Sequence, residues 1–286
     1  MKDKLYFEKI LVPVDGSLSC LRAKELAALI AKKFRSKVTV IHVISHHFMH
    51  PELKANYQLP PLILNELEKS YLKAGRKIIK IAEELFKEED IEVKAELVRH
   101  EDLAEPLLQQ IKKEAYDLVV MGNRSEDQAE HFSLGSVTEK VAMYAECPVL
   151  IVKKKTKITK LLVAIDGSEQ ANKALEYAIQ LAHNFGAKMT LLHVEEAKLF
   201  HLAPKAIKEV GKRILLDAET KVEEIKIDKR LEFGSPAETI IKVAKQENYD
   251  LIIIGSRGLS SVKRFLLGSV SADVSMHAQR SVLMVR

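Results

Sequence analysis

Short apolar runs alternate with amphipathic segments along the whole chain. Segments such as Leu21–Lys33 and Ala171–His183 carry apolar residues at helical spacing. The runs between them are nearly continuous in Val, Ile and Leu, as expected for parallel strands that helices cover on both faces. The alternation predicts an α/β fold with doubly wound sheets. The predicted strands lie near residues 9–14, 38–44, 92–98, 117–122 and 148–153, and then near 160–165, 188–194, 226–232, 250–255 and 281–286.

The two halves of the chain repeat each other. Asp15-Gly-Ser recurs 151 residues later as Asp166-Gly-Ser, and Gly135-Ser recurs 133 residues later as Gly268-Ser. The offset falls by 18, so the first copy has about 18 extra residues after its second predicted strand. We therefore predict two tandem domains, each with its own sheet, at residues 1–153 and 158–286.

A glycine-rich segment follows the fourth predicted strand of the second copy. It is spaced as Gly, two residues, Gly, nine residues and Gly-Ser, at Gly255, Gly258, Gly268 and Ser269. Glycines after a strand let backbone N–H groups approach an anion, and the start of a helix favours phosphate. Ser269 and Ser271 would add hydroxyl donors, and Lys263 and Arg264 would neutralise charge. Glycine also serves ordinary turns and serine commonly caps helices, so spacing alone leaves both interpretations open.

Asp166 ends the first predicted strand of the second copy, where doubly wound sheets bind their ligands. A carboxylate there can accept hydrogen bonds from ribose hydroxyls. The same Asp-Gly-Ser is also a plain turn from strand to helix with a serine cap. Asp15 stands at the equivalent place in the first copy, and the same two interpretations apply to it.

The first copy departs from the glycine spacing. Ser125 stands where the second copy has Gly258, although Gly122 and Gly135 keep their places. The intervening segment holds three acidic residues, Glu126, Asp127 and Glu130. Carboxylates repel a triphosphate unless a metal bridges them. We therefore expect the first site to be degenerate or to bind a ligand other than that of the second site.

These motifs resemble the universal stress protein family across nearly the whole chain. The second copy matches the family's ATP-binding glycine spacing, its Asp after strand one and its His-Val at the end of strand two, here His193-Val194. The resemblance implies a Rossmann-like five-stranded parallel sheet in each copy, with strand order 3-2-1-4-5. It also implies a nucleotide-binding role in the stress response, with ATP, alone or with Mg²⁺, held mainly in the second domain.

The resemblance also assigns ligand residues. In the second copy they are Asp166 for ribose, Val194 for adenine, and Gly255, Gly258, Gly268 and Ser269, with the neighbouring Val270 and Ser271, for the phosphates. The equivalent candidates in the first copy are Asp15, Val43, Gly122, Gly135 and Ser136. The two copies are expected to pack as a pseudo-dimer through their fifth strands, Val149–Val152 and Val282–Val285, and a homodimer of the whole chain would add to this.

Composition narrows the function classes. The 286 residues are 47% hydrophobic and 30% charged, which suits two soluble domains. There is no run of about 18 apolar residues, and Met1–Lys9 has no signal-peptide apolar region, so we expect no membrane partner. Two cysteines are too few for a disulfide framework, which favours a cytoplasmic location. A net charge of +5 without an Arg-rich helix or aromatic platform predicts no nucleic-acid partner.

Other functions stay open beside ATP binding. Enzymes of related adenine-nucleotide folds would need other motifs after the first strand than Asp-Gly-Ser. A nucleotide-independent interaction module is a second alternative, although the glycine spacing of the second copy argues against it there. A slow ATPase is compatible with ATP bound near Lys263 and a metal. Because the sequence shows no positioned general base, no catalytic residue is assigned.

Several smaller features have structural interpretations. His42 matches His193 within a strand, so a role in the fold is favoured over a metal site with the nearby His46, His47 and His50. Cys147 is expected to be a buried thiol. Leu62–Phe86 predicts an amphipathic crossover helix that packs on the core, with a lipid or partner groove as the alternative.

Overall fold

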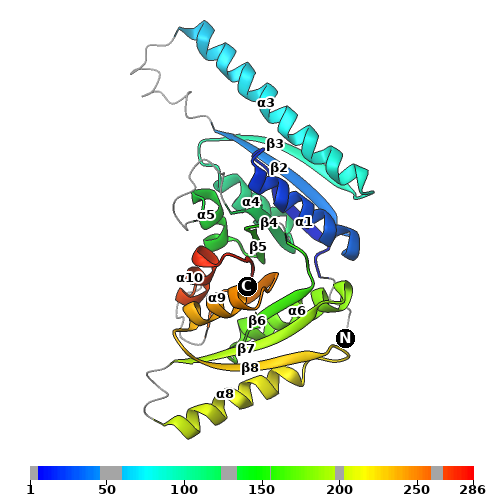
Figure 1. Ribbon diagram of the computed structural model, residues 1–286. Helices are drawn as coiled ribbons and strands as arrows, with labels where there is room; N and C mark the ends of the chain where they lie inside the picture. Colours follow the sequence, from blue (N-terminus) through cyan, green and yellow to red (C-terminus); the bar gives the residue numbers. More distant parts are fainter. Residues whose placement is uncertain (1–5, 46–59, 124–133, 155, 197–202, 259–266) are drawn as a thin grey trace.

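A single ten-stranded sheet runs through the described part of the molecule (Figure 1). The structure is a computed structural model that describes all residues except 1–5, 46–59, 124–133, 155, 197–202 and 259–266. The strand order is β3-β2-β1-β4-β5-β10-β9-β6-β7-β8. Each half is therefore a five-stranded parallel sheet of order 3-2-1-4-5, as predicted.

Strands and helices alternate in both halves. The first half contains β1 Lys9–Pro13, α1 Leu18–Phe34, β2 Lys37–Ser45, α3 Pro61–Glu88, β3 Val93–His100, α4 Glu105–Glu114, β4 Leu118–Gly122, α5 Ser136–Tyr144 and β5 Val149–Val152. The second contains β6 Lys160–Ala164, α6 Glu169–Phe185, β7 Lys188–Glu196, α8 Pro204–Glu219, β8 Ile227–Gly234, α9 Pro236–Gln246, β9 Leu251–Gly255, α10 Ser269–His277 and β10 Ser281–Val285.

Helices cover both faces of the sheet and form two apolar layers. α1, α3, α6 and α8 pack on one face, and α4, α5, α9 and α10 pack on the other. Successive strand residues enter opposite layers: Leu161 and Val163 face the first layer, and Leu162 faces the second. This two-sided burial explains why the strands read as continuous apolar runs.

The two halves meet through antiparallel pairing of β5 with β10. Leu283 lies opposite Leu150, and Met284 lies opposite Val149. All four side chains are at most 2% exposed. The prediction that the fifth strands join the copies is therefore confirmed. We call this β5–β10 pairing the seam.

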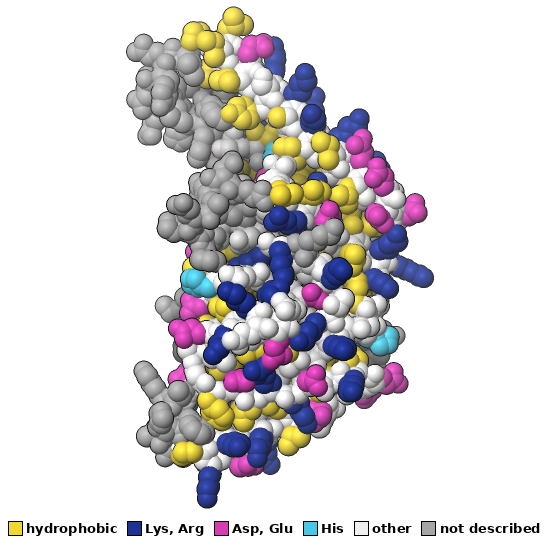
Figure 2. Space-filling view, in the orientation of Figure 1, with side chains coloured by type: hydrophobic (Ala, Val, Ile, Leu, Met, Phe, Trp, Pro, Cys, Tyr) yellow, Lys and Arg dark blue, Asp and Glu magenta, His cyan; other side chains and the backbone are white. Residues whose placement is uncertain are grey.

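The extra residues of the first copy lengthen its second helix. α3 has 28 residues, whereas its counterpart α8 has 16, a difference of 12. Ala82 and Phe86 of α3 are fully buried against the core, as predicted, but Leu62, Ile63 and Tyr71 in its first half are exposed. Among the described residues, no helix is long and apolar enough to cross a membrane. On the face in Figure 2, basic and acidic side chains are intermixed.

Candidate functional site

The strand order reverses between β6 and β9, and a pocket of about 510 Å³ opens beyond their carboxyl ends. This is where doubly wound sheets bind ligands. We call it the C-terminal pocket. It brings together eight candidate residues of the second copy: Asp166, Val194, Gly255, Gly258, Gly268, Ser269, Val270 and Ser271.

Asp166 is held by the turn that connects β6 to α6. Gly167 supplies the positive φ of +82° that this turn needs. One carboxylate oxygen of Asp166, Oδ1, accepts the backbone N–H of Ser168 at 2.9 Å, and the Ser168 hydroxyl caps α6. The plain turn-and-cap interpretation is therefore correct for part of the motif. It leaves the other oxygen, Oδ2, directed at the glycine-rich segment.

Gly258 lies directly against Asp166. A Cβ atom at position 258 would come within 2.5 Å of Asp166 Oδ2, closer than side-chain carbons approach oxygen. Gly255 has a different constraint, because a Cβ there would lie 2.7 Å from the backbone carbon of Gln170 at the start of α6. Gly255 thus allows α6 to pack on β9, and Gly258 leaves room for the carboxylate.

The backbone of Val194 faces the pocket. In a parallel pair, the N–H and C=O of alternate residues point toward the same neighbouring strand. The main-chain N–H and C=O of Leu192 point toward β6, since its carbonyl accepts the N–H of Ile165 at 2.9 Å. The main-chain groups of Val194, two residues further, point the same way, but the β6–β7 pairing ends at Ala164 and Leu192. Its main-chain donor and acceptor can therefore meet the edge of a base.

α10 begins at the pocket without a side-chain cap. Gly268 is its N-cap residue, and its own N–H donates to the Ser256 carbonyl at 2.8 Å. α6 differs, because the Ser168 hydroxyl accepts an N–H of its first turn. The first N–H groups of a helix carry partial positive charge and attract anions. The start of α10, at Ser269 and Val270, is thus suited to phosphate.

Ser271 requires a correction to the sequence-based expectation that it donates to phosphate. Its side chain is 3% exposed, and its hydroxyl donates to the Gly255 carbonyl at 2.6 Å. Thr138 makes the same bond to Gly122 in the first half, at 2.9 Å. These hydroxyls link β9 to α10 and β4 to α5. The Ser271 hydroxyl proton is thus already donated to the Gly255 carbonyl and does not face phosphate.

Several lining residues were not identified from the sequence. Pro236 and Ile240 of α9 form an apolar wall, and Glu195 and Arg257 also line the C-terminal pocket. The four-residue spacing of Pro236 and Ile240, directly after β8, was the available signal. Glu195 is buried and lies 3.0 Å from Nε2 of the buried His193, whose Nδ1 lies 2.6 Å from the Ile165 carbonyl. This contact fixes the chain just before Asp166.

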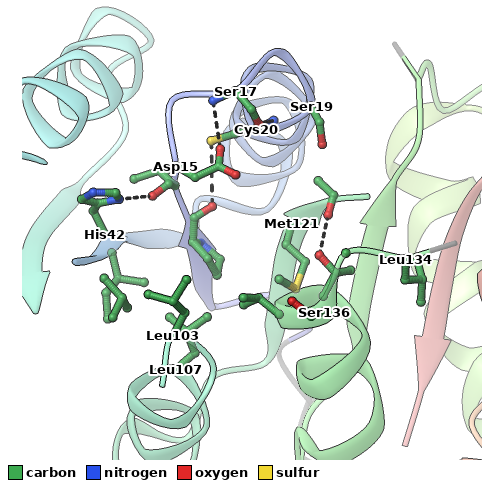
Figure 3. Close-up of a pocket in the computed structure, with 18 of the residues that line it drawn as sticks. Asp15, Ser17, Ser19, Cys20, His42, Leu103, Leu107, Met121, Leu134 and Ser136 are labelled. Carbon is green, nitrogen blue, oxygen red and sulfur yellow. Dashed lines mark hydrogen bonds between the residues drawn. The ribbon is translucent and has the colours of Figure 1, made fainter. Parts of the chain in front are cut away.

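A second pocket of about 630 Å³ lies at the equivalent place in the first half. We call it the N-terminal pocket. It is lined by the predicted Asp15, Val43, Gly122, Gly135 and Ser136. Figure 3 shows Asp15 on one side, Leu107 of α4 and Leu103 just before that helix on another, and Ser136 at the start of α5. His42 contacts the Val14 carbonyl at 2.6 Å, as His193 contacts Ile165, which supports its predicted role in the fold.

Some candidate residues lie outside the described part of the chain. They are Lys263, Arg264, Ser125, Glu126, Asp127, Glu130, His46, His47 and His50. Among the described residues, no three His, Cys, Asp or Glu side chains gather as a metal site requires. Cys147 is buried, as predicted, and burial raises the pKa of its thiol to about 12.

Comparison with known proteins adds to this geometry. A family model described as the universal stress protein family matches residues 7–153 and again residues 157–286. A universal stress protein of Mycolicibacterium smegmatis is 27% identical over 97% of this chain and 96% of its own length. One from Bacillus subtilis is 34% identical over 44% of this chain and 98% of its own length. A crystal structure of a universal stress protein from Archaeoglobus fulgidus shares the fold, with a TM-score of 0.72, 22% identity and 98% coverage of both chains.

Proposed function

This chain belongs to the universal stress protein family, and on that premise we propose that its C-terminal domain binds ATP in a stress-response or regulatory role. The observation that carries the proposal is the uncapped start of α10, which opens into the same pocket as Asp166 and Val194. One pocket thus offers an anion site, a carboxylate and an unpaired strand edge.

The three features match the parts of a nucleotide in order. The main-chain groups of Val194 would bind the adenine edge, between the apolar side chains of Leu192 and Ile240. Oδ2 of Asp166 would accept hydrogen bonds from ribose. The phosphates would lie at Gly268 and Ser269, where the helix dipole favours negative charge. Mg²⁺ would enter with the phosphates rather than occupy a protein-built cage.

The experiment is ligand release from the purified protein, read by mass spectrometry, followed by calorimetric titration with ATP. We expect one ATP per chain. Gly268→Val should weaken binding at least about tenfold, because its Cβ would already lie 3.3 Å from the Ser256 carbonyl oxygen and valine adds two methyl groups to that crowded position. Gly135→Val is the matched control in the other domain and should leave ATP affinity unchanged. Absence of released nucleotide together with no binding at millimolar ATP would refute the proposal.

The same preparation tests the alternative of slow turnover. Phosphate release from ATP, with and without Mg²⁺, separates a binding protein from a slow ATPase. Among the described residues, the carboxylates that line the C-terminal pocket are Asp166, Glu195 and Glu196. In this proposal Asp166 would bind ribose, Glu195 contacts His193, and Glu196 is exposed at the end of β7, so we assign none of the three as a base at a terminal phosphate. We propose binding as the function and expect hydrolysis to be slow or absent.

For the N-terminal pocket we propose a nucleoside-like ligand without a triphosphate. The specific observation is Glu139, which lies in the first turn of α5 and lines this pocket. Ala272 holds the equivalent position in α10, which has no acidic residue in its first turn. A carboxylate at a helix start takes the place that a phosphate would otherwise favour. Asp15 and Val43, which would serve ribose and base, are present.

Replacing each of these residues by its counterpart should make the nucleotide affinities of the two pockets more alike. Ala272→Glu is expected to weaken ATP binding about two- to fivefold, since a charge at a helix terminus contributes roughly 0.3–1 kcal/mol. Glu139→Ala should strengthen nucleotide binding to the N-terminal pocket by a similar factor, measured in a Gly268→Val background. Both residues can be replaced without opening a cavity, because Glu139 is exposed and Ala272 is partly exposed. Equal ATP affinities in wild type and Ala272→Glu would contradict this assignment.

A further inference from the structure

The N-terminal domain reaches across the seam to the far end of α10. Lys153 directly follows β5, and its Nζ donates to the carbonyl of Met276 at 2.9 Å. Met276 lies in the last turn of α10, whose first turn forms the phosphate end of the C-terminal pocket. The carbonyls of a last turn have no partner within their helix and carry partial negative charge. One domain thus supplies the cation that caps the proposed phosphate-binding helix of the other.

The contact is reciprocal. Arg286, 133 residues after Lys153, directly follows β10. Its Nη2 donates to the carbonyl of Ala142, in the last turn of α5, at 2.5 Å. The same position of the repeat therefore carries a cation in both domains, and each cation caps the other domain's helix. A chance surface lysine would not have this counterpart.

Lys153 is well placed to act on charge at the other end of α10. The helix has nine residues, so it is about 13 Å long. Neutralising its negative end leaves the positive potential at its start less opposed, and the ammonium itself attracts an anion along the axis. The neighbouring side chains at this point of the seam, Ser281 and Thr156, are uncharged and hydrogen-bonded to each other at 2.6 Å. Burial lowers the pKa of Lys153 to about 8, so the group still carries its charge at pH 7.

We propose that Lys153 is a positioning residue for the C-terminal site: by capping α10 across the seam, it raises the affinity of that site for phosphate charge. This rests on the proposed ATP function. In this proposal the N-terminal domain contributes a residue that raises the ligand affinity of the C-terminal site. Binding in the C-terminal domain thus depends on an intact seam, in addition to the residues that line the pocket.

The test compares Lys153→Met with Lys153→Arg in the full chain. ATP, ADP and AMP are titrated calorimetrically at pH 7. The methionine variant should weaken ATP binding about three- to tenfold and AMP binding less, because the lost interaction is with charge. The arginine variant should bind ATP as wild type does, since it keeps a cation at the Met276 carbonyl. Ser281→Ala is the control that perturbs the seam and leaves the ammonium in place.

The outcomes separate the inference from the function on which it rests. Failure of the wild-type protein to bind ATP would overturn the proposed function itself. Normal ATP binding by a folded Lys153→Met variant would overturn only the role of Lys153. Equal weakening of ATP and AMP, or equal weakening in Lys153→Met and Ser281→Ala, would show a purely structural role and also overturn it. Thermal unfolding of each variant confirms that it is folded at the titration temperature.

Discussion

Gly258→Val is expected to weaken ATP binding about a hundredfold while leaving the protein folded. The Cβ atom would lie 2.5 Å from Asp166 Oδ2, so the carboxylate has to rotate away. That movement is cheap for the fold, because the displaced atom is the end of a flexible side chain. It is costly for the ligand, because hydrogen bonds to a charged group contribute about 1.5–3 kcal/mol each. We expect a loss on the order of a hundredfold in calorimetric ATP affinity.

A second glycine provides the control for this substitution. Gly186 ends α6 in the left-handed region with a φ of +63°, and a Cβ there would meet no atom within 4 Å. Gly186→Ala should lower stability by up to about 1 kcal/mol, because alanine tolerates this φ poorly. Its ATP affinity should equal that of wild type. A folded Gly258→Val protein with normal ATP affinity would show that Asp166 does not contact the ligand.

The architecture could be predicted from the sequence because two local signals agree. Runs buried on both faces indicate parallel strands, and the internal repeat shows that the same unit occurs twice. The repeat also explains why the equivalent candidates of both copies converge: Asp15 and Ser136 line one pocket, and Asp166 and Ser269 line the other. The sequence shows which residues follow a strand, and in this fold ligands bind just beyond the carboxyl ends of the strands.

The parts that the sequence did not reveal depend on contacts between distant segments. Nothing local distinguishes the hydroxyl of Ser271, which bonds to Gly255, from that of Ser269 at the pocket. The sequence does not distinguish the roles of Gly255 and Gly258. Gly255 makes room for α6, whereas Gly258 makes room for the Asp166 carboxylate. Lys153 is the last residue of a predicted strand and had no assigned role, and only the antiparallel seam brings it to Met276.

The seam is the feature on which both domains depend, and Leu283→Lys tests it. Leu283 is 1% exposed, lies opposite Leu150, and faces the apolar layer that α1 and α6 cover. A lysine there would place an unpaired charge in the centre of a ten-stranded sheet, where the charged form is strongly disfavoured. We expect a loss of more than about 4 kcal/mol in the free energy of unfolding, or failure to fold, measured by denaturant titration.

Leu216→Lys is the matched control, since Leu216 lies on α8 and is 51% exposed. Its effect should stay within about 0.5 kcal/mol. The expected difference between the two variants follows from position, because both make the same chemical change. If Leu283→Lys were as stable as Leu216→Lys, the two halves of the sheet would not be joined through β5 and β10. Lys153 could then not reach α10, and each domain would have to bind its ligand alone.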